Sequence, residues 1–438
     1  MSMRKSTLAL AVAVAMSAGA PATVFATTGY FAHGYGAKMN GVGGAGVALP
    51  QDSMVSAVNP AGLAEVGNNK TIGLALFSPI REYEVAGFPG FFPPFPTSGP
   101  VESENEAFPI PNFGISWALD DRSALGIAAY GNGGMNTEYP DSATPFGAGV
   151  FGGGMVGDTN AGVDYMQLFI NASYARKITD NASVGFSGIM NFSRFEATGL
   201  AGFGGFSLDP AHLSDNGYDS DIGFGFKLGF LADLTPSVSV GASYQSKISN
   251  TLDDYAGLFP KEGEFDIPAT ATIGMAFRPN DRSAVTFDVQ QIWYGEEAWA
   301  QGTVQDLFQC MGGDFTRCLG GENGAGFGWE DVTVFKLGYM IETGNGWTWR
   351  VGYTTLDQPI PGGNNPMTSQ TTFNILAPGV VEDHFTFGFS KDMGNGRDFS
   401  VAFMYAPEVE VTGVDAFTPT NVIDLRMYQY QLEAAFNW

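Results

Sequence analysis

Charged residues are scarce in this chain of 438 residues. Asp, Glu, Lys and Arg together make up 15% of it, whereas ordinary soluble domains carry about 25%. After residue 26 the sequence also lacks any run of roughly 18 apolar residues, which excludes a protein that crosses a membrane with helices. Basic residues are rarer still, 20 against 45 acidic ones, and this excludes nucleic acid as a partner because its phosphates require Lys and Arg.

The first 26 residues have the features of a secretory signal peptide. Arg4-Lys5 precedes an apolar run over residues 8–20 that is too short to span a bilayer. Val24-Phe25-Ala26 then supplies small residues at the positions that a signal peptidase reads. We therefore predict export from the cytoplasm and a mature chain that starts at Thr27.

Cysteine is nearly absent. Cys310 and Cys318 are the two cysteines, and they enclose the seven residues of MGGDFTR. In an exported protein, two cysteines at this spacing predict a disulfide in preference to a metal or redox site. We expect the bond to close a small surface loop.

Histidine is equally rare, and this argues against an enzyme. A serine nucleophile needs a base and an orienting group, but His33, His212 and His384 show no recognisable serine partner and no G-x-S-x-G occurs. The same scarcity offers no metal site. GVGGAG, residues 41–46, has the letters of a dinucleotide fingerprint, but no apolar strand precedes it and no amphipathic helix follows. We predict no catalytic activity, no cofactor and no metal.

Glycine and aromatic residues are abundant instead, with 60 Gly and 13% aromatic residues. Segments of period two recur along the chain, separated alternately by tight turns and long loops. The six tight turns lie at 120–123, 179–181, 235–237, 280–283, 344–346 and 394–396, and the seven long connections near 86–104, 138–162, 199–218, 251–262, 299–328, 357–381 and 411–423.

These connections join fourteen strands, with short turns on one side and long loops on the other. Both chain ends fall on the short-turn side, as in bacterial outer-membrane barrels. We therefore predict an all-β fold, a fourteen-stranded antiparallel transmembrane β-barrel. A large secreted β-protein is the competing fold, but it would not segregate its loops by length.

Alternation within the strands predicts which side chains face the lumen. In DIGFGFKLGF, residues 221–230, the apolar side chains share one face and Lys227 lies on the other. A lysine or arginine facing lipid at the midplane costs about 2–4 kcal/mol. We therefore expect Lys227, Lys247 and Arg350 to point into the lumen. There they either bind a carboxylate cargo or brace the interior through acidic partners, and we favour bracing.

Residues 27–69 precede the first strand and have small residues, little alternation and no long helix. A barrel of fourteen strands is wider than side chains alone can fill. We predict that this segment is a hatch in the lumen. The domain organisation is then a signal peptide at 1–26, a hatch at 27–69 and a barrel at 70–438.

The hatch sequence, above all NGVGGAGVALPQDSMVSAVNPAGLAEVG, resembles the hatch of the FadL/TodX (OmpP1) family of outer-membrane transporters for hydrophobic compounds. The family's Asn-Pro-Ala signature matches Asn59-Pro60-Ala61, and WRVGYTTLDQPIP, residues 349–361, resembles its Arg-x-Gly-Tyr…Asp-x-x-x-Pro stretch. The strand count, the hatch position and the C-terminal aromatic residue agree, so the resemblance covers essentially the whole mature chain.

The resemblance implies that long-chain fatty acids, or aromatic hydrocarbons in some members, bind in apolar pockets. They leave sideways into the membrane through a gap made by an inward kink in the third strand. In this sequence that strand is interrupted by Gly131, Gly133 and Gly134, and glycine in a strand marks a kink, a bulge or a close approach. Tyr30 and Phe31 lie where the family's hatch begins, so they either line its inner pocket or pack the hatch.

The first long loop contains GFPGFFPPFP, which holds Phe88, Phe91, Phe92 and Phe95 between rigid prolines. Contiguous exposed apolar surface marks a binding site, so we expect these side chains to form the entrance for apolar cargo. The alternative is that they pack against other loops.

These features predict passive uptake of hydrophobic molecules across the bacterial outer membrane, with long-chain fatty acids as the expected cargo. A hydrocarbon or aromatic-compound channel of the same fold is the alternative, as is a porin for hydrophilic solutes if the hatch moves. We expect a monomer whose partners are hydrophobic small molecules and outer-membrane lipid and lipopolysaccharide. The final strand, residues 428–438, ends in the aromatic Trp438, which resembles the signal read by the outer-membrane assembly machinery.

Overall fold

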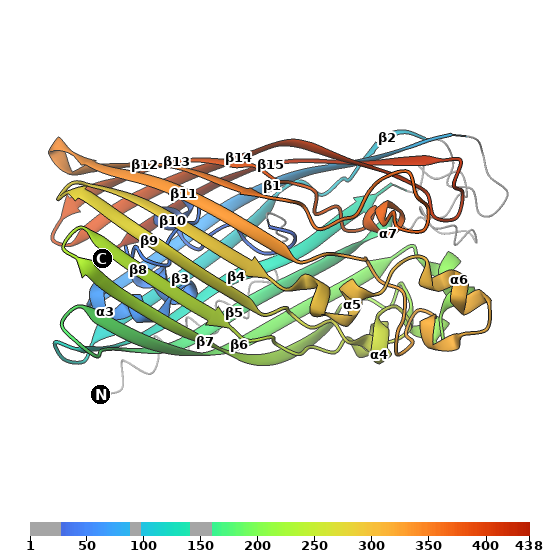
Figure 1. Ribbon diagram of the computed structural model, residues 1–438, viewed down its shortest axis with the longest axis horizontal. Helices are drawn as coiled ribbons and strands as arrows, with labels where there is room; N and C mark the ends of the chain where they lie inside the picture. Colours follow the sequence, from blue (N-terminus) through green and yellow to red (C-terminus); the bar gives the residue numbers. More distant parts are fainter. Residues whose placement is uncertain (1–27, 88–97, 141–159) are drawn as a thin grey trace.

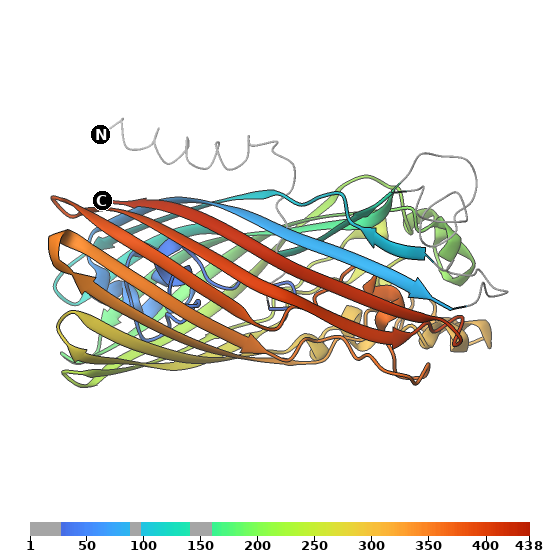
Figure 2. The same ribbon diagram turned by 90° about the horizontal axis from the view of Figure 1, so that it is seen from above.

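The strands form one sheet that closes on itself, as Figures 1 and 2 show. The computed structural model describes residues 28–87, 98–140 and 160–438. The strands are β1 Asn69–Ala86, β2 Ser98–Glu102, β3 Phe108–Ala118, β4 Ser123–Tyr139, β5 Ala161–Lys177, β6 Ala182–Thr198, β7 Asp219–Thr235, β8 Val238–Gln245, β9 Thr270–Asn280, β10 Ser283–Ile292, β11 Val332–Thr343, β12 Trp347–Leu356, β13 His384–Gly394, β14 Arg397–Val414 and β15 Val422–Asn437.

The wall of the barrel has fourteen strand positions, as predicted. β2 and β3 both pair with the same edge of β1, β2 with its second half and β3 with its first. They therefore occupy one position in succession. β15 closes the barrel by pairing antiparallel with β1, from Thr71↔Asn437 to Ala86↔Val422. The final strand of the sequence is thus in use almost to its last residue.

Short and long connections are segregated at the two ends of the barrel. All six predicted tight turns lie at one end, on the left in Figure 1. The described parts of the long connections lie at the other end and carry short helices, among them α4 Pro260–Gly263, α5 Ala298–Gln301, α6 Asp306–Met311 and α7 Thr371–Asn374. Among the residues that the structure describes, no helix is long and apolar enough to cross a membrane.

The outer surface of the barrel is apolar because the strands alternate. In β7 the side chains of Ile222, Phe224 and Leu228 are 52%, 70% and 48% exposed, whereas Lys227 between them is 5% exposed. Such a band is costly in water and is covered by hydrocarbon in a membrane. The polar side chains point into the lumen, so the inner face of the wall is polar and the outer face is apolar.

The N-terminal segment, residues 28–68, lies inside the barrel, where Figure 2 shows it in blue among the strands. It contains α2 Ala37–Asn40, the 3-10 turns Ser53–Ala57 and Pro60–Gly62, and α3 Leu63–Val66. Most of its side chains are buried, and the N–H groups of Gly46 and Val47 donate to Asp288 Oδ2 of β10 at 2.8 and 2.9 Å. This arrangement fits the predicted hatch, while the boundaries at 27 and 69 stay predictions.

The Asn-Pro-Ala signature explains how this segment is attached. Asn59 Oδ1 accepts a hydrogen bond from the N–H of Ala61 at 3.1 Å and so caps the turn that follows. Its Nδ2 donates to the carbonyls of Val47 at 2.7 Å and Phe230 at 2.9 Å. One side chain therefore joins two parts of the N-terminal segment to β7.

Candidate functional site

The barrel wall has a gap between β3 and β4. The two strands pair only from Ala118↔Ala124 to Phe113↔Ala129. Beyond this point β4 continues with β5 as its partner, whereas β3 continues with β1. The upper half of β4 is therefore unpaired with β3 in the part of the chain that the structure describes.

The glycine-rich stretch of β4 lies at this gap. The register between β4 and β5 shifts between Gly131 and Gly133, so Asn132 is the additional residue of a bulge. The bulge lies among the glycines for which the sequence predicted an opening in the wall. It fits a wall that bends at Gly131, Gly133 and Gly134, and the role of these residues as a lateral exit stays a proposal.

The N-terminal segment covers the inner side of the gap. The N–H of Ala32 donates to the carbonyl of Asn132 at 2.8 Å, and that of Gly134 donates to the carbonyl of Tyr30 at 3.0 Å. A Cβ atom at position 133 would overlap the Tyr30 carbonyl, so glycine is required there by close backbone approach. Residues 30–32 of the N-terminal segment thus lie along β4 where β3 no longer pairs with it.

Residues between β2 and β3 close the outer end of the gap. The N–H of Glu138 donates to Ser103 Oγ at 2.9 Å, and the N–H of Glu104 donates to the carbonyl of Glu138 at 2.8 Å. The gap is therefore a window in the wall, bounded at both ends by hydrogen bonds.

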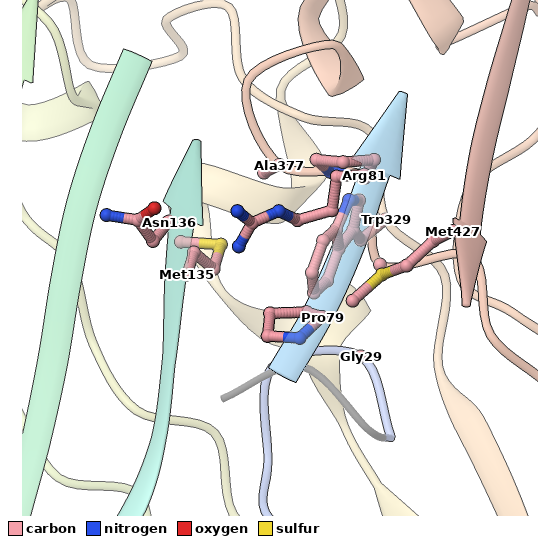
Figure 3. Close-up of a pocket in the computed structure, with 10 residues that line it drawn as sticks. Gly29, Pro79, Arg81, Met135, Asn136, Trp329, Ala377 and Met427 are labelled. Carbon is pink, nitrogen blue, oxygen red and sulfur yellow. The ribbon is translucent and has the colours of Figure 1, made fainter. Parts of the chain in front are cut away.

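A small cavity lies behind this window, and we call it the gap pocket (Figure 3). Its lining comes from β1, β4, β15, the start of the N-terminal segment and two long connections. The lining residues are Gly29, Pro79, Arg81, Met135, Asn136, Trp329, Ala377, Pro378, Gly379 and Met427. This lining is apolar except for the guanidinium and the amide.

A second cavity lies among the long connections, and we call it the outer pocket. All of its lining residues are apolar: Val163, Leu200, Phe203, Leu258, Phe259, Trp299, Leu319, Ala325, Gly326, Phe327, Phe373 and Leu376. The predicted entrance residues Phe88, Phe91, Phe92 and Phe95 lie outside the described residues.

The two pockets are neighbours separated by an aromatic partition. Trp299 of the outer pocket and Trp329 of the gap pocket have ring centroids 5.5 Å apart. Tyr30 contacts both, at 5.6 and 6.1 Å, and is fully buried. Phe31, 2% exposed, stacks on Tyr30. These two residues therefore pack the partition, and a ligand that moves between the pockets must displace aromatic rings.

The predicted lumenal cations divide into two groups. Lys227 is buried and donates to the carbonyl of Ala57, and Arg350 is buried and donates to Gln51 Oε1 at 2.9 Å and to Ser390 Oγ at 2.6 Å. Both hold the N-terminal segment against the wall, which fits bracing, but these partners are neutral groups and not the acidic side chains that were expected.

Lys247 differs from the expectation. β8 ends at Gln245, so strand parity no longer applies two residues later. The Lys247 side chain is 46% exposed and pairs with Asp266 at 2.6 Å and Glu297 at 3.3 Å. Burial raises the pKa of Glu297 to about 7, and the Lys247 charge opposes this rise. The cluster links two long connections at the outer end of the barrel.

Cys310 and Cys318 form a disulfide in the connection between β10 and β11. Both are buried, and Leu319, the next residue, lines the outer pocket. The bond therefore closes a short loop beside that pocket. Within the described ranges, no group of three or more His, Cys, Asp or Glu side chains could hold a metal ion.

Arg81, the cation among the described lining residues of the gap pocket, was not predicted from the sequence. The signal was present: Arg81 follows TIGLALFSPI, and in β1 the odd-numbered residues from Thr71 to Val85 are buried while their neighbours are more exposed. The parity argument that was applied to Lys227 places Arg81 in the lumen as well.

Comparisons with known proteins agree with this architecture. A family model described as outer membrane protein transport protein (OMPP1/FadL/TodX) matches residues 12–368. The long-chain fatty acid transport protein of Salmonella typhi is 22% identical to this chain, over 93% of each.

Solved structures share the fold at low sequence identity. A Pseudomonas aeruginosa FadL homologue matches with a TM-score of 0.67 and 15% identity, covering 94% of this chain and 99% of that one. The toluene transporter TodX of P. putida matches with a TM-score of 0.66 and 18% identity, covering 92% and 98%. Since the family model covers most of the sequence, the chain belongs to the OMPP1/FadL/TodX family of outer membrane transport proteins.

Proposed function

We propose that this protein takes up hydrophobic molecules passively across the outer membrane, with long-chain fatty acids as its cargo. The cargo enters the apolar outer pocket, displaces the aromatic partition and reaches the gap pocket. From there it leaves sideways between β3 and β4 into the bilayer. The observation that carries this proposal is the window in the wall with an apolar cavity behind it.

The energetics favour a lateral route. Each methylene kept out of water contributes about 0.8 kcal/mol, so an apolar chain loses much of its binding free energy if it crosses an aqueous lumen. The lower lumen is filled by the N-terminal segment and its polar contacts with Lys227 and Asp288. A side exit through the window keeps the chain in apolar surroundings throughout.

A channel for hydrocarbons or aromatic compounds is the second candidate. The aromatic partition and the all-apolar outer pocket favour it, since neither contains a group that would select a carboxylate. The relatives do not distinguish between the two kinds of cargo, because one is named as a fatty acid transport protein and another as a toluene transporter. In both cases the protein is a transport protein and not an enzyme.

Filling the gap pocket tests the exit route. Met135→Trp adds bulk at a buried position, 3% exposed, and is expected to lower the uptake rate of radiolabelled oleate about tenfold in cells that lack other uptake routes. Leu125→Trp is the matched control, since Leu125 belongs to the same strand but is 40% exposed on the lipid face. Heat-modifiable migration checks that both barrels fold. Unchanged uptake in a folded Met135→Trp barrel would rule the route out.

A further inference from the structure

We propose that Arg81 is the anchor for the carboxylate head group of the cargo in the gap pocket. This inference rests on the proposed function and narrows it: the molecule that pauses at the window is an amphiphile with one carboxylate and an apolar chain. A neutral hydrocarbon would not satisfy this site.

Arg81 is buried without a counterion. The residue is 2% exposed, and charged side chains are almost never so deeply buried unless they are paired. Glu102 and Glu106 act on its charge from nearby. Neither they nor any other acid of the described chain lies within the 4.0 Å of an ion pair with it. The site therefore holds a positive charge that no described carboxylate neutralises by contact.

The hydrogen bonds of Arg81 are incomplete. Nη2 donates to Ser103 Oγ at 3.0 Å and to the carbonyl of Asn105, and the guanidinium lies 5.7 Å from the Phe108 ring centroid. Nε and Nη1 are buried and have no acceptor among the residues that the structure describes. Leaving a buried charged donor unsatisfied is costly. A ligand carboxylate would supply both the missing acceptor and the missing negative charge.

The lining around the guanidinium offers a charged group for the head of an amphiphile and apolar groups for its chain. In Figure 3 the Arg81 side chain extends from β1 toward Met135 and Asn136 of β4, with Trp329 and Met427 on its other side. The apolar members of this lining suit methylene groups. Asn136 Oδ1 is a second unpartnered atom, and as an acceptor it suits a water or a hydroxyl group. Arg81 is therefore the member of the lining that selects an anion.

A structural role is the alternative, since Arg81 also ties β1 to the segment that closes the outer end of the window. Ser103→Ala separates the two roles, because it removes one bond of this tie, keeps the bond to the Asn105 carbonyl and leaves Nε and Nη1 unchanged. If Arg81 only braces the wall, Ser103→Ala and Arg81→Met will have effects of the same kind.

The test compares oleate with oleyl alcohol, which has the same chain but no charge. Binding of each to the purified protein is measured in lipid nanodiscs at constant pH. The outer pocket is wholly apolar and contributes equally to both ligands. Another cavity in the lumen is lined in part by Lys227 and Lys336 and is able to favour an anion as well, so the assignment to the gap pocket rests on the response of Arg81→Met. The wild type is expected to bind oleate about tenfold or more tightly than the alcohol. Arg81→Met is expected to abolish the preference and to keep the alcohol affinity within about twofold.

Three results would overturn the proposal: equal affinities in the wild type, a preference that survives in Arg81→Met, or a preference that Ser103→Ala abolishes equally. The wild-type comparison needs no variant, so the proposal can fail even if Arg81→Met does not fold. Uptake by Met135→Trp tests the exit route separately. Normal lateral transport without a carboxylate preference would refute the anchor alone.

Discussion

At the scale of single residues, the polar side chains of the lumen decide how the N-terminal segment is held. Asn59 belongs to that segment and binds a carbonyl of β7. Lys227 and Arg350 belong to strands and bind residues of the segment. Arg81 is different because it lies at the window and retains unused donors. Position in the barrel, and not charge alone, therefore separates a bracing residue from a candidate ligand contact.

Asn59→Ala removes a cap and two contacts at once. We expect the free energy of unfolding to fall by about 1–2 kcal/mol, because a lost N-cap costs about 1 kcal/mol and buried carbonyls lose their donor. Urea unfolding of the barrel in micelles measures the change. Asn59→Asp is the comparison: it keeps the capping oxygen but turns a second oxygen toward the carbonyls of Val47 and Phe230, so it should destabilise the barrel more than Asn59→Ala does. An Ala variant as stable as the wild type would contradict this assignment.

Arg350→Met tests bracing by the lumenal cations. The variant loses the bonds to Gln51 and Ser390, so the N-terminal segment should loosen and steady ion current through planar bilayers should rise about tenfold. Oleate binding should remain within about twofold, because Arg350 lines neither the gap pocket nor the outer pocket. A large loss of oleate binding with no change in current would instead make Arg350 a ligand contact.

At the scale of elements, the window depends on where the pairing of two strands stops. Past the shared pair Phe113↔Ala129, β3 continues beside β1 and β4 continues beside β5, so the two strands separate. The bulge at Asn132 then offers backbone groups to Tyr30 and Ala32. The bulge in β4 thus lies at the edge of the window and also binds the N-terminal segment that covers it.

Gly133→Val should break the contact between β4 and the N-terminal segment. Its side chain would overlap the Tyr30 carbonyl, so the hydrogen bonds at Ala32 and Gly134 are lost. Hydrogen exchange at the Ala32 amide should accelerate at least tenfold. Gly188→Val is the matched control, because a Cβ there meets nothing within 4 Å. Equal exchange in the two variants would show that glycine at 133 is not needed for this approach.

Replacing both Cys310 and Cys318 by serine should loosen the roof of the outer pocket. Leu319 adjoins the disulfide and lines that pocket, so we expect oleate uptake at low oleate concentration to fall several-fold. Uptake at saturating oleate should stay near the wild-type value, since the window is distant from this loop in the chain. An unchanged concentration dependence would separate the disulfide from cargo entry.

At the scale of the whole molecule, a barrel whose N-terminal segment occupies the lumen and covers the window predicts little ion flow. The interior is occupied by residues 28–68, and the band that faces outward is apolar. Planar bilayers containing the wild type should therefore be almost silent. A large, steady current would favour the porin for hydrophilic solutes over uptake through the window.

Local pattern alone determined much of this protein. Alternation and turn chemistry are properties of neighbouring residues, and they led to the fourteen-stranded barrel, its orientation of loops and the burial of Lys227 and Arg350. Strand parity does not decide the direction of Lys247, because β8 stops at Gln245 and nothing local indicated this end.

Only the tertiary structure decided where the pockets and the window are. The gap pocket joins Arg81 of β1, Met135 of β4, Trp329 of a long connection and Met427 of β15. The window exists because strand pairing stops at Ala129, which is a matter of register between strands. Register and cavity shape arise from contacts between distant parts of the chain, and the period of a single strand carries no information about them.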